Sequence, residues 1–303
     1  MPKIQSHLAV TYALLVLIWA TTPLAIVWSV KDLNPFWALA FRFFLALPLA
    51  LSLLLIFKIR LPFNAQSLHS YLAGSFSFIG SQIFTYMATQ YLSSGIIALM
   101  FGLTPIMAGL MGWAWFKQYL HVLQWCGMLI ALSGLGIICF SGQQHIQPMG
   151  IVLMLMSVFN YALSIFWVKK IRAPLEPMAQ ATGSILISSL VALCMLPFIW
   201  SKFPTHLPQI QSLIALGYTV VVASLLAMFC YFKLVQNIQP TTLSLTNVMT
   251  PLLALLIGAL LNHEALTLKI VLGAAILIIG LLVYFSRDLQ LQQKWQQRFK
   301  KMS

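Results

Sequence analysis

The hydrophobic positions of this chain form long uninterrupted runs separated by short polar breaks. The runs cover residues 8–30, 35–57, 69–90, 93–116, 121–140, 149–169, 178–198, 212–233, 240–262 and 266–285. Each run is close to the ~20 residues that an α-helix needs to cross about 30 Å of hydrocarbon. The pattern predicts ten transmembrane helices, whose ends are defined to within a few residues.

The same pattern excludes a transmembrane β-barrel and a soluble domain. Barrel strands alternate apolar and polar positions, whereas runs such as residues 8–18 and 274–285 are apolar on every side. The chain is 61% hydrophobic and 7% charged, far from the roughly one-quarter charged residues of soluble domains. Its mean hydropathy is +0.93. We therefore expect an all-α integral membrane protein.

The positive charge of the chain indicates its orientation rather than a nucleic-acid partner. The formal net charge is +13, but the basic residues lie in the breaks between apolar runs. With the N-terminus inside, thirteen Lys and Arg fall on the cytoplasmic side, and only Lys31, Lys202 and Lys269 fall outside. Such a bias predicts a multi-pass protein of the inner (cytoplasmic) membrane with both termini in the cytoplasm.

The second half of the chain repeats the first. At an offset of 146 positions, Thr104-Pro105 aligns with Thr250-Pro251, Leu120 with Leu266, Gly127 with Gly273, and Gly134-Leu135 with Gly280-Leu281. An offset of about 141 aligns the first two runs with the sixth and seventh. Because each unit holds five helices, the second unit enters the membrane from the opposite side, as in the inverted repeats of secondary transporters.

With these features the sequence resembles the ten-helix EamA-type carriers of the drug/metabolite transporter superfamily, over essentially the whole chain. The resemblance rests on Trp19, on Arg42 within Phe41-Arg42-Phe43-Phe44, on Thr104-Pro105 and Thr250-Pro251, and on Asn262-His263-Glu264-Ala265-Leu266-Thr267 followed by Gly273 and Gly280. One departure is that Gln118 stands where the second repeat has Glu264. The resemblance implies EamA-type repeats at 1–145 and 146–286, followed by a basic amphipathic cytoplasmic tail at 287–303.

The resemblance also implies metabolite efflux through a central cavity lined by helices 1, 3, 4, 6, 8 and 9, with helices 5 and 10 at the periphery. Polar residues within spans are costly unless they face a partner or a cavity. Eight of them define our predicted substrate site: Trp19, Thr22, Gln82, Tyr86, Asn160, Ser164, Ser244 and Asn247. The alternative is that these side chains join helices by interhelical hydrogen bonds.

Four further residues have predicted mechanical or structural roles. Pro105 and Pro251 each remove a backbone donor within a span and serve either as hinges for gating or as static kinks. Arg42 lies near the membrane midplane, where we favour a structural clamp over a site for an anionic solute group. Glu264 lies near the start of the last helix, where a capping carboxylate is favourable.

These predictions favour transport over catalysis. The spans hold no paired carboxylates and no His/Asp cluster, so we predict no enzyme activity, no cofactor and no metal site. We expect a secondary transporter that exports small organic solutes, amino acids or related metabolites first. A polyspecific carrier of lipophilic cations is the alternative, because aromatic faces attract cations. The alternative from a different class of function is a membrane-embedded enzyme that acts on lipid-linked substrates. The expected partners are the solute and the lipid bilayer, and a homodimer is left open.

Overall fold

The computed structural model describes the backbone of residues 2–117, 119–140, 146–238 and 246–302. Within these ranges it describes the side chains of residues 7–286, apart from 116, 232, 235 and 236. All regular structure in the described residues is helical, as predicted. Eight helical segments there are long and apolar enough to cross a membrane.

The helices of the first half are α1 (Pro2–Ser29), α2 (Pro35–Ile56), α3 (Ala65–Ser75), η1 (Phe76–Gly80), α4 (Ser81–Ala88), α5 (Ser94–Gly102), α6 (Thr104–Phe116) and α7 (Val122–Cys139). Those of the second half are α8 (Pro148–Ile171), α9 (Pro177–Ile199), η2 (Trp200–Lys202), α10 (Ile210–Tyr218), η3 (Thr219–Leu226), α11 (Ala227–Asn237), α13 (Thr246–Asn262) and α14 (Leu268–Met302). The short segments η1 and η3 are π-helical, and η2 is a 3₁₀ turn.

Two of the ten predicted helices fall outside the eight candidate spans. The run at residues 69–90 is divided among α3, η1 and α4, where polar residues such as His69 and Ser70 lower the hydropathy. The run at residues 240–262 is described from residue 246, as the 17-residue apolar helix α13. Helix length and hydropathy thus support eight spans, fewer than the sequence pattern predicts.

The bounds of the helices repeat along the chain. Helix α6 ends at Phe116 and α13 ends at Asn262, 146 positions later. Helix α7 begins at Val122 and α14 begins at Leu268, again 146 positions later. The residue that follows α6, Lys117, has a φ of 50°, and the residue that follows α13, His263, has a φ of 52°. A π-helical segment also interrupts each half, between α3 and α4 and between α10 and α11. The sequence register is therefore matched by equivalent backbone features.

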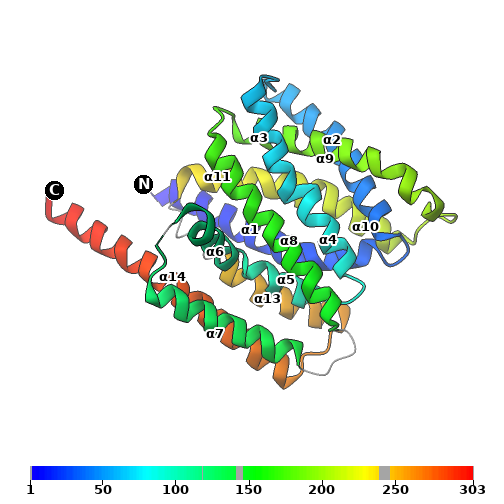
Figure 1. The fold of residues 1–303 in the computed structure, drawn as a ribbon. Coiled ribbons are helices and arrows are strands. Elements are labelled where there is room, and N and C mark those ends of the chain that lie inside the picture. Colours follow the sequence, from blue (N-terminus) through cyan, green and yellow to red (C-terminus); the bar gives the residue numbers. More distant parts are fainter. Residues whose placement is uncertain (1, 118, 141–145, 239–245, 303) are drawn as a thin grey trace.

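Helices α7 and α14 run side by side along one edge of the bundle (Figure 1). A Cβ added to Gly127 would lie 2.7 Å from the carbonyl oxygen of Gly280, and one added to Gly134 would lie 2.5 Å from that of Gly273. The partner number falls as the α7 number rises, so the two helices are antiparallel. The absent side chains let the two backbones touch, as small residues do in membrane helix pairs. A Cβ added to Gly136 of the same helix would have nothing within 4 Å.

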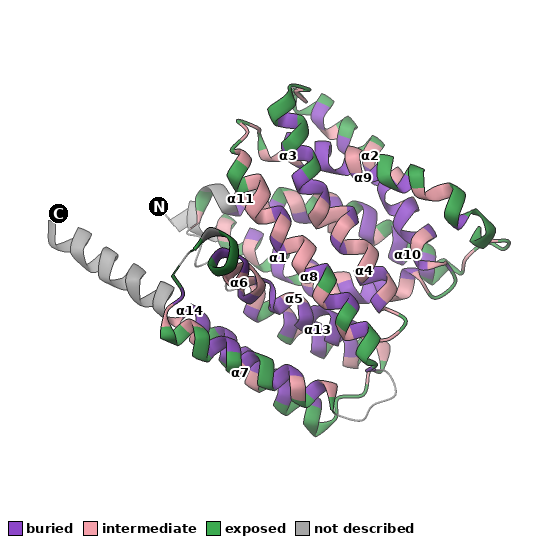
Figure 2. Cartoon of the chain, in the orientation of Figure 1, coloured by how far each residue is buried: buried purple, intermediate pink, exposed green. Residues whose placement is uncertain are grey.

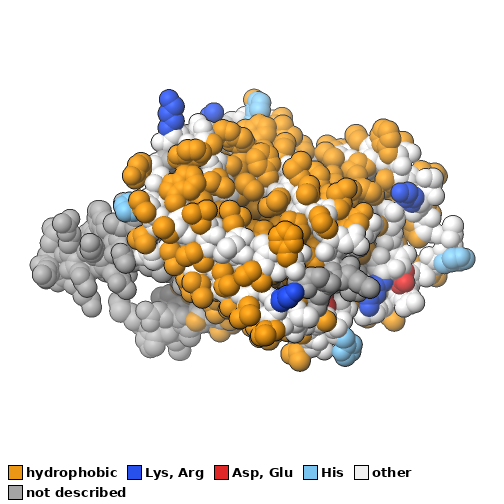
Figure 3. Space-filling view, turned by 60° about the horizontal axis from the view of Figure 1, so that its bottom comes forward, with side chains coloured by type: hydrophobic (Ala, Val, Ile, Leu, Met, Phe, Trp, Pro, Cys, Tyr) orange, Lys and Arg blue, Asp and Glu red, His pale blue; other side chains and the backbone are white. Residues whose placement is uncertain are grey.

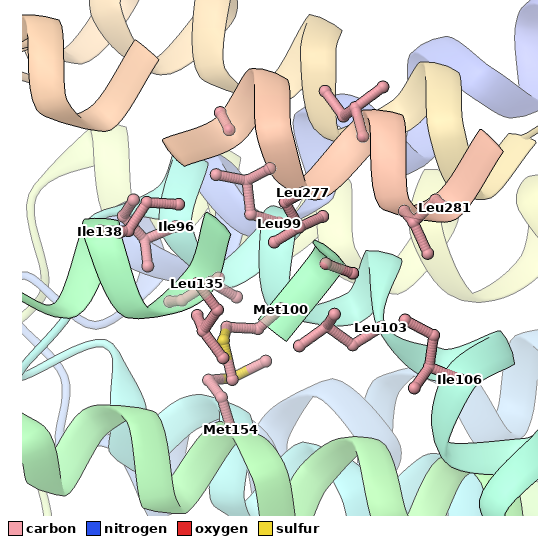
Figure 4. Packing of buried hydrophobic residues seen from close by; sticks show 14 of the residues in the cluster. Ile96, Leu99, Met100, Leu103, Ile106, Leu135, Ile138, Met154, Leu277 and Leu281 are labelled. Carbon is pink, nitrogen blue, oxygen red and sulfur yellow. The ribbon is translucent and has the colours of Figure 1, made fainter. Parts of the chain in front are cut away.

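The largest apolar cluster joins this pair to the rest of the bundle. Leu277 and Leu281 of α14 and Leu135 of α7 pack with Leu99 of α5 and Met154 of α8 (Figure 4). All of them are less than 9% exposed. The core therefore connects helices from both halves of the chain.

The outer surface is apolar rather than polar. Exposed and buried residues alternate around the helices (Figure 2). Large apolar side chains such as Leu55, Leu129 and Leu260 are 79%, 66% and 75% exposed. Hydrophobic side chains cover most of the face in Figure 3, with few charges among them. Because soluble proteins rarely expose such continuous apolar surface, the surrounding medium is lipid.

Candidate functional site

Arg42 lies inside the bundle and binds side chains of two other helices. It is 5% exposed. Its Nε donates to Ser224 Oγ of η3 at 3.1 Å, and one terminal nitrogen donates to Gln82 Oε1 of α4 at 3.1 Å. Arg42 thus links α2, α4 and η3 through side-chain hydrogen bonds. Its partners are side chains within the bundle, and Ser224 was missed by the sequence analysis.

Tyr86 lies one turn after Gln82 on the same helix, in the apolar cluster formed with α1, α2, α9, α10 and η3. Its side chain is fully buried, and its hydroxyl has no hydrogen-bond partner among the described residues. The buried hydroxyl of Thr250 in α13 also lacks a partner there. A buried hydroxyl without a hydrogen bond costs about 1–3 kcal/mol, so a polar partner at either group would be favourable.

Asn160 and Ser164 of α8 face a different neighbour. Asn160 Oδ1 lies 3.3 Å from where a Cβ on Gly80 would be, and Asn160 Nδ2 donates to the Met156 carbonyl at 2.8 Å. Ser164 Oγ lies 3.4 Å from the Gly74 carbonyl. Ser164 thus makes the kind of interhelical hydrogen bond named as the alternative, whereas the Asn160 amide bonds within α8 and lies against Gly80 of η1.

Trp19 leads to an aromatic group that the sequence analysis missed. Its ring centroid lies 5.7 Å from that of Tyr231 in α11, and Tyr161 of α8 lies 6.1 Å from Phe101 of α5. Tyr161 and Tyr231 are close enough to interact electrostatically. All four rings are partly exposed, although they lie on α1, α5, α8 and α11. The available signal was the mid-span position of Tyr161, next to Asn160.

Of the remaining predicted site residues, Thr22 and Asn247 lie in contacts within or between helices, and Ser244 is not described. Thr22 Oγ1 donates to the Ile18 carbonyl at 2.6 Å, within its own helix. The backbone oxygen of Asn247 lies 3.4 Å from where a Cβ on Gly102 would be, which places it at the contact of α5 and α13. Ser244 lies outside the described residues. The eight predicted residues are therefore distributed over several helix contacts.

The two prolines have different local structures. Pro105 lies in the first turn of α6. The helix is interrupted just before it, at Leu103, which separates α5 from α6. Pro251 lies inside α13, which is continuous from Thr246 to Asn262. The break in the first half thus has no counterpart in the equivalent part of the second half.

Glu264 caps a helix of the opposite half rather than its own. Its carboxylate accepts from the backbone nitrogens of Ser94 at 2.9 Å and Gly95 at 3.0 Å, and from Ser94 Oγ at 2.6 Å. Asn262 Nδ2 also donates to it at 3.1 Å, and Trp28 Nε1 donates to Asn262 Oδ1 at 2.8 Å. Glu264 therefore caps α5, whereas the sequence analysis placed its capping role near the start of the last helix.

Asp32 makes a matching contact at the start of α10. Its Oδ2 accepts from Ser212 Oγ at 2.7 Å and from the Gln209 backbone nitrogen at 3.1 Å. Ser212 Oγ also lies 3.1 Å from the Trp28 carbonyl. Hydrogen bonds thus run from Asp32 through Trp28 and Asn262 to Glu264, and join the ends of α1, α5, α10 and α13.

A cavity of 270 Å³ lies away from the predicted site, between α2, α9 and the η3–α11 segment. Apolar side chains form most of its wall, Thr182 and Ser224 lie along it, and Glu176 and Lys233 also line it. None of the eight predicted substrate residues lines this cavity. In the part of the chain that the structure describes, no three His, Cys, Asp or Glu side chains group as metal ligands.

The sequence profile of the EamA-like transporter family matches residues 7–140 and again residues 148–286. The chain belongs to the EamA-like transporter family. The "Uncharacterized inner membrane transporter YedA" of Escherichia coli K12 is 27% identical over 254 residues, which cover 84% of this chain and 82% of that protein. The "Uncharacterized transporter YvbV" of Bacillus subtilis 168 is 23% identical over 194 residues, 62% of each chain.

A solved structure agrees with this assignment at the level of the fold. A crystal structure with 15% sequence identity matches with a TM-score of 0.65 and covers 94% of this chain and 99% of that chain. The family and the names of the relatives indicate a transporter rather than an enzyme. Together with the apolar helices, they identify a multi-pass protein of the inner membrane.

Proposed function

We propose that this EamA-family protein is a secondary transporter that exports small organic solutes, with amino acids or related metabolites first. It works by alternating access between two inverted five-helix repeats, residues 1–145 and 146–286. In this proposal the chain spans the membrane ten times, with both termini in the cytoplasm and the basic tail of residues 287–303 on the cytoplasmic side. The backbone of α14 is helical to Met302, and the side chains beyond Ser286 lie outside the described residues.

The paired glycines of α7 and α14 carry the proposal of inversion. Gly127 and Gly134 are equivalent to Gly273 and Gly280 at the 146-residue offset. The observed contacts are Gly127 with Gly280 and Gly134 with Gly273. Exchanging the two repeats converts one contact into the other, as a two-fold axis between antiparallel helices requires. The two separate matches of the family profile support the same division of the chain.

The prolines support alternating access between these repeats. The first repeat is broken before Pro105, whereas the equivalent segment around Pro251 is one continuous helix. If the repeats exchange these two conformations, the helix break moves to the second repeat. The central cavity between the repeats then opens to the other side of the membrane. Pro251 already lacks the backbone donor that would hold its helix straight. Inverted repeats that differ locally are suited to such an exchange.

Side-chain chemistry supports a neutral or zwitterionic solute. Trp19, Tyr161 and Tyr231 offer aromatic surface with polar groups, and the unpartnered hydroxyls of Tyr86 and Thr250 offer hydrogen bonds. No Asp or Glu side chain lies within this group. The aromatic rings also favour the alternative, a carrier of lipophilic cations, which bind aromatic faces.

Transport into liposomes tests the proposal. The purified protein is first screened against a metabolite library by thermal shift, because a ligand that binds only the native state raises the melting temperature. Each stabilising solute is then followed by flux in reconstituted liposomes. Movement of an unchanged solute supports a carrier, and product formation without net movement contradicts it. Lipophilic cations form a second arm of the same screen.

Variants then locate the site. We expect Tyr86→Phe and Asn247→Ala to reduce flux at least about fivefold while the folded protein stays in the membrane, since a polar contact to the solute is worth about 1 kcal/mol or more. Asn160→Ala tests the packing alternative at the contact with η1. Tyr119→Phe is the matched control, because Tyr119 is 83% exposed. Unchanged flux in Tyr86→Phe and Asn247→Ala would remove these residues from the site.

A further inference from the structure

The cavity between α2, α9 and the η3–α11 segment has the shape of a groove that starts at one end of the bundle. Helix α2 ends nearby at Ile56, α9 begins at Pro177, and Lys233 lies near the end of α11. Nine residues separate Glu176 from Ile185, and nine separate Ser224 from Lys233, so the groove extends ~14 Å along the helices at 1.5 Å per residue. Helices α2 and α9 lie side by side in Figure 1.

The wall of the groove is apolar and reaches the lipid-facing surface. Ala50 and Leu53 of α2, Ile185 of α9, and Leu225 and Met228 line it. Phe229, which also lines it, is 50% exposed on the outside of the bundle. At 270 Å³ the groove lies just below the ~300–1,000 Å³ of pockets for drug-sized ligands. Its size and depth suit one hydrocarbon chain entering from the bilayer.

Two opposite charges line the groove near its end. Lys233 Nζ lies 6.0 Å from the centre of the Phe229 ring. Glu176 precedes α9, and its carboxylate makes no capping hydrogen bond to that helix. Within the described residues, neither charge forms an ion pair. One cationic and one anionic group are thus free to bind a ligand that carries both charges.

We infer that this groove binds one aminophospholipid of the bilayer, with an acyl chain between α2, α9 and α11, its phosphate at Lys233 and its ammonium at Glu176. A primary ammonium can donate hydrogen bonds to the carboxylate, and the phosphate is a strong acceptor for the lysine. A phospholipid with a quaternary ammonium lacks those donors, and one with an uncharged glycerol head lacks the cation. None of the eight predicted substrate residues lines the groove, and its occupancy can be measured without transport.

The inner end of the groove connects this lipid to the clamp. Ser224 lines the groove and accepts the hydrogen bond from Arg42 Nε. A chain seated there covers the clamp from the bilayer side and excludes water from the buried guanidinium. We therefore expect the bound lipid to stabilise the contact of α2 with η3.

The test uses the purified full chain in detergent. Phosphatidylethanolamine, phosphatidylcholine and phosphatidylglycerol are added separately, and binding is followed by native mass spectrometry and by the melting temperature. We expect phosphatidylethanolamine to bind at least about tenfold more tightly than either of the others, as one charge-assisted hydrogen bond allows. Equal binding of the three lipids, or tighter binding of phosphatidylglycerol, would overturn the inference.

Substitutions identify the groove as the site. Glu176→Gln and Lys233→Gln should each reduce phosphatidylethanolamine affinity about tenfold. Lys202→Gln is the matched control, because Lys202 is exposed beyond the opposite end of α9 and should leave affinity unchanged. Ala181→Leu fills the groove and should weaken all three lipids. If that variant fails to fold, the two charge variants still decide, and wild-type affinity in both of them contradicts the inference.

Discussion

Two antiparallel helix pairs join the halves of this transporter, and they are built differently. In the pair α7 and α14, glycines bring the backbones into direct contact, Gly127 with Gly280 and Gly134 with Gly273. In the pair α5 and α13, Gly102 meets Pro251, and the polar residues Ser94, Asn262 and Glu264 close one end. The first pair depends on shape and the second on directional hydrogen bonds as well.

This difference indicates which contact is fixed and which can change. Backbone contact between glycines has no alternative partner, because any sliding of α7 places side chains against backbone. The carboxylate of Glu264 can exchange its donors for water when the end of the bundle opens. Pro251 lies within α13 of this pair, and Pro105 follows α5 directly, in the first turn of α6. We therefore expect α7 and α14 to remain together as a scaffold while α5 and α13 move.

The largest expected effect comes from breaking the glycine contact. Gly134→Leu should destabilise the protein by more than about 3 kcal/mol, because a Cβ there would lie 2.5 Å from Gly273 oxygen and Leu277 nitrogen. Thermal unfolding and size-exclusion chromatography in detergent measure the loss. Gly136→Leu on the same helix is the matched control and should fold normally. Equal stability of the two variants would contradict the expectation that α7 and α14 form a fixed scaffold.

The next effect concerns the cap on α5. Glu264→Ala leaves two backbone donors and the Ser94 hydroxyl without their acceptor, so we expect a loss of about 2–3 kcal/mol in stability. Glu264→Gln keeps one acceptor and should lose about half as much. Lys269→Gln, in the first turn of α14, is the control for a charge change in the same region. A melting temperature for Glu264→Ala within error of the wild type would contradict a stabilising role of Glu264 as the cap of α5.

The two prolines of the proposed hinges, Pro105 of α6 and Pro251 of α13, should respond unequally to substitution. Pro251→Ala restores a backbone hydrogen bond inside a continuous helix, so we expect a gain of about 1 kcal/mol in stability together with slower flux. Pro105→Ala lies in a first turn, where a missing donor has little cost, and should stay within about 0.5 kcal/mol of the wild type. Faster flux in Pro251→Ala would contradict a hinge at that position.

The smallest effect tests the link between the two helix ends. Trp28→Phe keeps the aromatic bulk but removes the hydrogen bond to Asn262, and should cost about 1 kcal/mol by thermal unfolding. Trp200→Phe is the control, since Trp200 is 63% exposed. Similar melting temperatures for the two variants would show that the indole bond adds nothing to the closed end.

Particular residues show how far the candidate site could be predicted. The four-residue spacing of Gln82 and Tyr86 places them one turn apart on one face of α4. It gave no information on the neighbour of that face, which is α2 with Arg42 and η3 with Ser224. Ser224 looks like any other small residue in an apolar run, so only the fold identifies it as a partner of Arg42.

The same limit applies to the repeat. Equivalent positions predicted a common role for Pro105 and Pro251, yet only the first follows a break in its helix. Local sequence sets where a helix can bend, because proline removes a donor. Packing against other helices decides whether it does bend, since the cost of a kink is comparable to the contacts on either side.

The sequence by itself determined the membrane environment, the helical class, the family and the register of the repeat, because each depends on apolar runs or on residues compared along the chain. Tertiary structure decided which faces meet, that Glu264 caps α5, that the rings of Trp19 and Tyr231 are neighbours, and that a groove opens beside Lys233. Those features depend on the rotation of each helix about its axis. In lipid that rotation is set by packing and hydrogen bonds between helices, so a pattern read along one helix cannot specify it.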